Sequence, residues 1–182
     1  MKMLDKNKYG IVDIIGVTFV VVAIISAGGI YYTASTYSDI SNTLTSASVG
    51  VAEFNITHYE DTGTYEFLTT LMINNPSNLD INIYSVEFNI YAYPSESFGL
   101  DLSHYIATGR GIQAGNSTIS KESTSYIYQR LTTTSNSIED NINNGATFAG
   151  LSGFILYEIV DYPEVTKKVY FGYWNWVTIH ES

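Results

Sequence analysis

The chain has 182 residues, a formal net charge of −10 and no cysteine. The lack of cysteine excludes disulfides, thiol catalysis and cysteine-based metal sites. Beyond residue 33 the chain carries all but two of its acidic residues but few lysines and arginines, so we expect no nucleic-acid partner.

The stretch 11–33 (IVDIIGVTFVVVAIISAGGIYYT) predicts a transmembrane helix. It has no charge from Ile14 to Tyr32, and a helix of this length extends about 28 Å, close to the hydrocarbon thickness of a bilayer. Apolar residues fall on every face, which is typical of a helix surrounded by lipid. The alternative is a cleaved signal peptide with a small-residue site at Ser26-Ala27-Gly28, although the apolar region of such a peptide is shorter.

The charges that flank this span predict its orientation. Lys2, Lys6 and Lys8 precede it, and no lysine or arginine follows until Arg110. By the positive-inside rule, residues 1–10 are cytoplasmic and the C-terminal part lies outside the cytoplasmic membrane.

The segment 34–48 (ASTYSDISNTLTSAS) predicts a Ser- and Thr-rich stalk. Its apolar residues are spaced three and four apart, which suits either a helix that packs in an oligomer or on the domain, or an irregular tether. Small residues in the span also permit close contact between helices. The candidate residues for self-association through the N-terminal helix are Ala23, Ala27, Tyr37, Ile40 and Leu44.

Residues 49–182 predict one extracytoplasmic β domain, because apolar residues now alternate with polar ones. Phe54 and Ile56 begin a hairpin that turns at 60–63 and returns through 65–74. Asn75-Pro76 ends that strand, because proline lacks the backbone donor. The next strand changes parity between Ile83 and Val86, which predicts a bulge near Tyr84-Ser85.

The middle of the domain gives weaker patterns. Leu100, Leu102 and Ile106 predict a short edge strand before a turn at 109–111. The sequence does not show which strand this edge strand pairs with. A polar loop at 113–123 then leads to another alternating strand.

The last third of the chain gives a second set of signals. A strand at 125–132 precedes a short capped helix at 137–144. The apolar run 149–160 predicts a central strand, and Pro163 turns the chain into a hairpin partner at 165–173. The final run, Tyr173-Trp174-Asn175-Trp176, is either a strand that buries one tryptophan or an aromatic patch that faces a membrane or a partner.

The order of these features resembles the late-embryogenesis-abundant type 2 family, which carries the water-stress and hypersensitive-response (WHy) domain. The resemblance covers about 49–179 and rests on an apolar strand that ends in Asn-Pro, a step with a change of parity, an aromatic-rich strand, glycine turns, a short helix and a Gly-hydrophobic-hydrophobic strand. These read 67–73, Asn75-Pro76, Leu79-Ile81-Ile83, Val86-Phe88-Ile90, Gly109, Gly115, 137–144 and 153–157. The resemblance implies a seven-stranded sandwich of immunoglobulin-like or fibronectin-III-like form and no catalytic residues.

The amino terminus has a second resemblance. Lys8-Tyr9-Gly10 before an apolar helix is similar to the class III signals of archaeal pilins, archaellins and their stator relatives, in which the basic residue directly precedes the glycine. This resemblance implies assembly through the N-terminal helix.

Candidate chemical groups are few. His58, His104 and His180 lack zinc-site spacing, and the acidic residues lack calcium-loop spacing, so we expect no metal, no cofactor and no catalytic residue. Asn55-Ile56-Thr57 and Asn116-Ser117-Thr118 are N-glycosylation sequons, so Asn55 and Asn116 are candidate sites if the domain is extracellular.

These features predict a membrane-anchored, non-enzymatic β-sandwich protein that acts in surface structure, binding or stress protection. Its expected partners are the lipid bilayer and a cell-envelope protein or glycan. The alternative is a subunit of a pilus-like or archaellum-like filament, or of its envelope-anchored stator.

Overall fold

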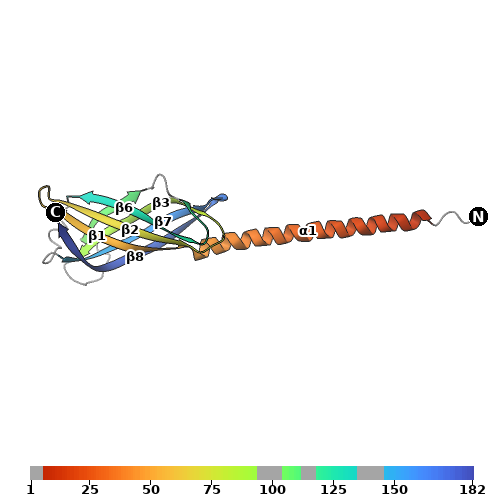
Figure 1. Cartoon of the computed structure of the whole chain (residues 1–182), viewed down its shortest axis with the longest axis horizontal. Coiled ribbons are helices and arrows are strands. Elements are labelled where there is room, and N and C mark those ends of the chain that lie inside the picture. The colour runs from red at the N-terminus through yellow and green to blue at the C-terminus, as the bar shows by residue number, and fades with distance from the viewer. Residues whose placement is uncertain (1–5, 94–103, 112–117, 135–145) are drawn as a thin grey trace, which may run out of the picture. The chain divides into compact units, whose positions relative to one another are not determined.

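The computed structural model describes residues 6–93, 104–111, 118–134 and 146–182, with side chains from residue 16 onward except that of residue 146. Within these ranges the chain forms one helix followed by eight strands (Figure 1). This confirms a mainly β chain with one apolar N-terminal helix. The elements are α1 Lys6–Ser46, β1 Ser48–Tyr59, β2 Thr64–Asn75, β3 Ile81–Tyr93, β4 Tyr105–Gly111, β5 Thr118–Ile119, β6 Ser123–Thr133, β7 Ala146–Ile159 and β8 Tyr162–Glu181.

Helix α1 is long and apolar enough to cross a membrane. Its 41 residues extend about 60 Å, roughly twice the hydrocarbon thickness of a bilayer. The helix continues through the predicted stalk to Ser46, so the interpretation of the stalk as an irregular tether is wrong. Hydroxyl side chains are satisfied inside the helix, because Thr36 Oγ1 donates to the Tyr32 carbonyl at 3.0 Å and Ser46 Oγ donates to the Asn42 carbonyl at 2.7 Å.

Residues Asn42–Ser182 form a unit built on one curled sheet. The strand order is β4-β3-β7-β8-β1-β2-β6, and β5 pairs with β3. Strand β8 is antiparallel to β7 and, near its end, parallel to β1. This long shared strand curls the sheet into a half-barrel, and the predicted immunoglobulin-like or fibronectin-III-like sandwich is not confirmed.

Local patterning correctly predicted the first three strands. Strands β1 and β2 form the expected antiparallel hairpin, and its turn uses Gly63 with a φ of 62°. Strand β2 ends at Asn75, directly before the proline. The register of β3 against β7 shifts between Ile83 and Ser85, which is the predicted bulge.

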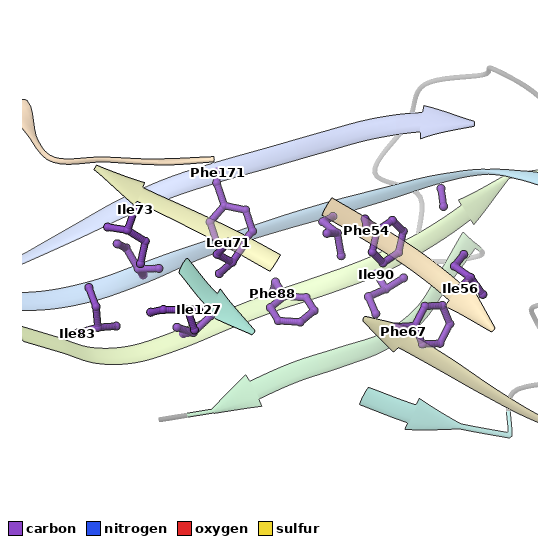
Figure 2. Close-up of a cluster of buried hydrophobic side chains, with 14 of the residues drawn as sticks. Phe54, Ile56, Phe67, Leu71, Ile73, Ile83, Phe88, Ile90, Ile127 and Phe171 are labelled. Atoms are coloured by element: carbon purple, nitrogen blue, oxygen red, sulfur yellow. The ribbon is translucent and has the colours of Figure 1, made fainter. Parts of the chain in front are cut away.

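The core lies on the concave face of the curled sheet (Figure 2). Strands β1, β2 and β6 supply one side of it, and β3, β7 and β8 supply the other. Of the two parity sets predicted for β3, Ile81 and Ile83 and then Val86, Phe88 and Ile90 are buried there, whereas Leu79 precedes the strand and is half-buried. The side chains shown in Figure 2 include Phe54, Ile56, Phe67, Leu71, Ile73, Ile83, Phe88, Ile90, Ile127 and Phe171.

Phe88 in β3 is opposite a glycine on each neighbouring strand. A Cβ on Gly109 in β4 would lie 2.3 Å from Phe88 Cζ, and a Cβ on Gly153 in β7 would lie 2.5 Å from Phe88 Cβ. The predicted turn at Gly109-Arg110-Gly111 is therefore wrong, because these residues belong to β4 and Gly109 makes room for the phenyl ring.

The C-terminal hairpin also differs from its prediction. The chain turns at Val160-Asp161, and Pro163 lies inside β8, where the register against β7 is irregular and a missing donor is tolerated. The final aromatic run continues the same strand. The predicted helix at 137–144 lies outside the described residues, as do Leu100 and Leu102 of the predicted edge strand.

The last turn of α1 packs into the β unit. Thr43 is fully buried, and its carbonyl accepts a 2.9 Å hydrogen bond from the Tyr157 hydroxyl. The last four carbonyls of a helix have no partner inside the helix, so this bond satisfies one of them. Burial raises the pKa of Tyr157 from 10.0 to about 12.

Candidate functional site

The convex face of β3, β4, β7 and β8 carries a second cluster of aromatic side chains, separate from the core. Tyr91, Tyr93 and Phe148 are buried in it, and Tyr105 and Trp174 pack against them. The Trp174 ring covers Gly150, where an added Cβ would lie 2.0 Å from the ring. The final aromatic run is a strand, as one of the two interpretations expected, and alternation in β8 places both tryptophans on the convex face. Trp174 is half-buried against the cluster and Trp176 is 43% exposed, so neither is fully buried.

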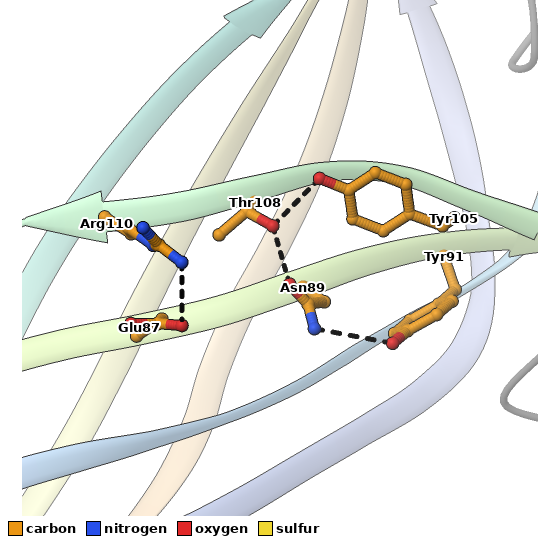
Figure 3. A network of polar contacts seen from close by, with 6 residues as sticks. All are labelled: Glu87, Asn89, Tyr91, Tyr105, Thr108 and Arg110. Atoms are coloured by element: carbon orange, nitrogen blue, oxygen red, sulfur yellow. Dashed lines mark hydrogen bonds and ion pairs between the residues drawn. The ribbon is translucent and has the colours of Figure 1, made fainter. Parts of the chain in front are cut away.

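Polar side chains on β3 and β4 form a network beside this aromatic cluster (Figure 3). Thr108 Oγ1 donates to Asn89 Oδ1 at 2.7 Å and lies 2.9 Å from the Tyr105 hydroxyl. Asn89 Nδ2 donates to the Tyr91 hydroxyl at 3.5 Å. These bonds fix the orientation of the Asn89 amide from both of its ends.

A hollow of about 180 Å³ opens on the same face. Cross-strand register brings its residues together, because Asn89 pairs with Ser152, Glu87 pairs with Phe154, and Phe154 pairs with Tyr170. Phe88 and Gly153 also line it. The hollow therefore combines two aromatic rings with a carboxylate, an amide and a hydroxyl.

Two cations, Arg110 and Lys168, lie beside this hollow in a chain whose formal net charge is −10. Arg110 forms an ion pair with Glu87, with 3.4 Å between Nη2 and Oε1. Lys168 Nζ lies 3.9 Å from the centre of the Phe154 ring, which is cation–π geometry. Phe154 and Tyr170 meet edge to face, with ring centres 6.0 Å apart.

The histidines do not form a site. His58 stacks on Tyr65 with ring centres 4.3 Å apart, His104 packs against Tyr93 at 4.4 Å, and His180 lies on β8. Among the described residues no group of three His, Asp or Glu side chains is arranged to hold a metal ion.

The two sequons have different outcomes. Asn55 alternates with buried Phe54 and Ile56, so its side chain faces outward, as modification requires, and Nδ2 donates to Glu53 Oε1 at 2.8 Å. Asn116 lies outside the described residues. Glycosylation stays a prediction at both positions.

The candidate self-association residues all lie on α1. Ala23 and Ala27 are exposed, and the side chain of Tyr37 is 69% exposed. Ile40 is half-buried, and Leu44 packs against the core of the β unit, so part of its apolar surface is used within its own chain.

Sequence reasoning missed the convex-face site, although it singled out the final aromatic run. The alternation in β3 placed Glu87 and Asn89 on the face opposite Phe88, which was the available signal. Nothing in the sequence indicated that β7 would bring Ser152 and Phe154 beside them.

Comparisons with known proteins support the fold alone. No protein-family model and no curated protein matches the chain. A solved structure assigned to the late embryogenesis abundant (LEA) group matches with a TM-score of 0.52 at 10% identity, covering 91% of this chain and 88% of that chain. A protein assigned as ApaA from Bordetella pertussis matches with a TM-score of 0.47 at 11% identity, covering 73% of this chain and 93% of that chain.

A protein from Archaeoglobus fulgidus matches with a TM-score of 0.45 at 13% identity, covering 73% of this chain and 94% of that chain. Of these three likenesses, that to the LEA-group structure alone exceeds a TM-score of 0.5. The chain is therefore similar in fold to a LEA-group protein.

Proposed function

We propose that this chain is a single-pass membrane protein whose β unit stands outside the cytoplasmic membrane and binds a component of the cell envelope without catalysing a reaction. The observation that carries this proposal is the convex face of β3, β4, β7 and β8. The larger core lies on the opposite face of the sheet, and this face places aromatic rings beside polar groups that hydrogen bonds hold in place. Binding sites in proteins typically combine such surfaces.

Helix α1 supports the membrane anchor, and the three lysines before the span support the orientation. The LEA-like fold is in keeping with a role in surface structure or stress protection, and the WHy assignment stays part of the proposal. The immunoglobulin-like form also stays part of the proposal. It is supported by the curl of the sheet, which brings β3 and β7 on one side and β1, β2 and β6 on the other together over one core.

Co-sedimentation tests the binding function. Full-length protein in phosphatidylcholine nanodiscs is mixed with native cell envelopes, and empty nanodiscs serve as the control. We expect saturable binding to the envelopes. Binding no greater than that of empty nanodiscs would contradict the proposal.

The alternative function is a filament or stator subunit that assembles through α1. A concave stretch of the helix favours it, because small side chains there leave room for a second helix. Its lining residues are Ser26, Gly29, Ile30, Thr33, Ala34 and Tyr37.

Cross-linking in membranes tests this alternative, and the absence of native cysteine makes each thiol unique. Ser26→Cys lies on the concave stretch, and Gly28→Cys, about 200° around the helix, is the matched control. Disulfide-linked dimers of Ser26→Cys alone would favour the subunit. Monomers of both variants would favour the anchored binding module.

A further inference from the structure

We propose that the hollow between β3, β7 and β8 binds one hexopyranose unit of a neutral glycan, an inference that rests on the proposed envelope-binding function. The side chains that carry it are Glu87, Asn89, Ser152, Phe154 and Tyr170. Size, aromatic surface, polar groups and charge each point to a sugar.

The first argument is size and shape. The hollow has about 180 Å³ of space, which is room for one pyranose ring. Next to the hollow, Gly172 has no side chain that would project from the convex face. The space there is open, because an added Cβ would meet no atom closer than 3.7 Å. Trp174 and Trp176 follow on the same face of β8. A glycan of several sugars could therefore lie along β8 with one ring in the hollow.

The second argument is the exposed aromatic surface. Tyr170 is 71% exposed, and nothing in the core requires a ring at this position. A pyranose ring presents C–H groups on one face, and these pack against the electron-rich face of an aromatic ring. Phe154 stands edge-on to Tyr170 and forms a second wall.

The third argument is the set of polar groups. A sugar hydroxyl both donates and accepts hydrogen bonds, so it suits a site with mixed donors and acceptors. The Glu87 carboxylate accepts, the Asn89 amide donates through Nδ2, and the Ser152 hydroxyl does both. Thr108 and Arg110 hold Asn89 and Glu87 in place, so little side-chain freedom is lost on binding.

The fourth argument is charge, which favours a neutral sugar over an acidic one. Glu87 lines the hollow, and the chain has a net charge of −10, so a uronate or sulfate would be repelled. The nearby cations are already engaged, because Arg110 pairs with Glu87 and Lys168 lies over Phe154.

Binding of defined oligosaccharides to the full-length protein tests the proposal. The protein is held in phosphatidylcholine nanodiscs, because glycoside detergents would compete for the site. The probes are maltohexaose, mannohexaose and cellohexaose, with hexagalacturonate as the acidic comparison, and isothermal titration measures affinity. We expect at least one neutral probe to bind, and to bind more tightly than hexagalacturonate.

Three variants locate the site. Tyr170→Ala removes the exposed ring, Ser152→Ile fills the hollow, and both should weaken binding at least about tenfold. Tyr128→Ala is the matched control, because Tyr128 is 67% exposed on β6, outside the hollow, and should bind as the wild type does. Circular dichroism confirms that each variant is folded.

Two results would overturn the sugar proposal: no binding of any neutral probe, or unchanged binding by folded Tyr170→Ala and Ser152→Ile variants. Envelope co-sedimentation on the same preparations separates this failure from failure of the proposed function. Envelope binding that persists, and that protease treatment of the envelopes abolishes, would indicate a protein partner and leave the function standing. Loss of both kinds of binding would remove the function as well.

Discussion

The position of Phe88 between two glycines makes a prediction that distinguishes its two neighbours. A Cβ on Gly109 would lie 2.3 Å from Cζ, at the far end of the Phe88 side chain. A Cβ on Gly153 would lie 2.4 Å from the Glu87 carbonyl oxygen and 2.5 Å from Phe88 Cβ, both close to the backbone. Leucine at position 88 lacks Cζ but keeps Cβ and the backbone, so it should relieve the first clash and not the second.

The expected magnitudes follow from these contacts. Gly109→Ala and Gly153→Ala should each destabilise the fold by about 1–3 kcal/mol or more, as overpacking in a closely packed core does. In Phe88→Leu the penalty of Gly109→Ala should largely disappear, which gives a coupling energy of about 1–3 kcal/mol. The penalty of Gly153→Ala should be unchanged within about 0.5 kcal/mol.

Denaturant unfolding of the single and double variants measures both couplings. Equal couplings, or a stable Gly109→Ala variant, would show that Phe88 does not lie between β4 and β7. Glu87 and Asn89 would then lose their place on the convex face, and the reasoning that builds the hollow would be refuted.

Four further predictions concern polar contacts of three residues in the β unit. Tyr157→Phe should lower the free energy of unfolding by about 1–3 kcal/mol, because it removes the hydroxyl that donates to the buried Thr43 carbonyl. Thermal unfolding measures this loss, and a loss near zero would contradict the bond. Folding raises the pKa of Tyr157 from 10.0 to about 12. Its contribution to stability is therefore complete below about pH 10, where the folded and unfolded states are both protonated, and is lost as the pH rises toward 12. Between these values the free energy of unfolding of the wild type should fall more steeply with pH than that of Tyr157→Phe. Arg130→Ala should lower the free energy of unfolding, because it removes the cation that pairs with the buried Glu66 carboxylate, and unchanged urea unfolding would contradict this. Asn75→Ala should lower the free energy of unfolding by about 2–4 kcal/mol, because the two N–H groups on Nδ2 of this fully buried residue are shared among three backbone carbonyls. A near-neutral result in the same assay would show that these bonds are not formed.

Local patterns were sufficient to predict the strands whose signal lies in neighbouring residues. Alternation identified β1, β2 and β6, and the change of parity in β3 located its bulge, because side chains of a strand must alternate between the two faces of a sheet. The Asn75-Pro76 pair correctly marked the end of β2. Its sequence did not show that the Asn75 amide would bind the carbonyls of Leu79, Ile119 and Ser120.

The features that were missed depend on contacts between distant strands. Gly109 was interpreted as a turn residue, but the reason for glycine there is the Phe88 ring on another strand. The curl of the sheet depends on β8 pairing with both β7 and β1, which no local signal reveals. The hollow likewise depends on the register of three strands, so Tyr170 could not be assigned to it from sequence.

The orientation of the chain across the membrane is the claim on which the proposed function depends, and thiol labelling in intact cells tests it most directly. The chain has no cysteine, so Tyr128→Cys in the β unit and Lys8→Cys before the span each carry one thiol. With a membrane-impermeant maleimide, we predict that Tyr128→Cys is labelled in intact cells and that Lys8→Cys is labelled only after lysis. Labelling of Lys8→Cys in intact cells, with Tyr128→Cys protected until lysis, would contradict the account.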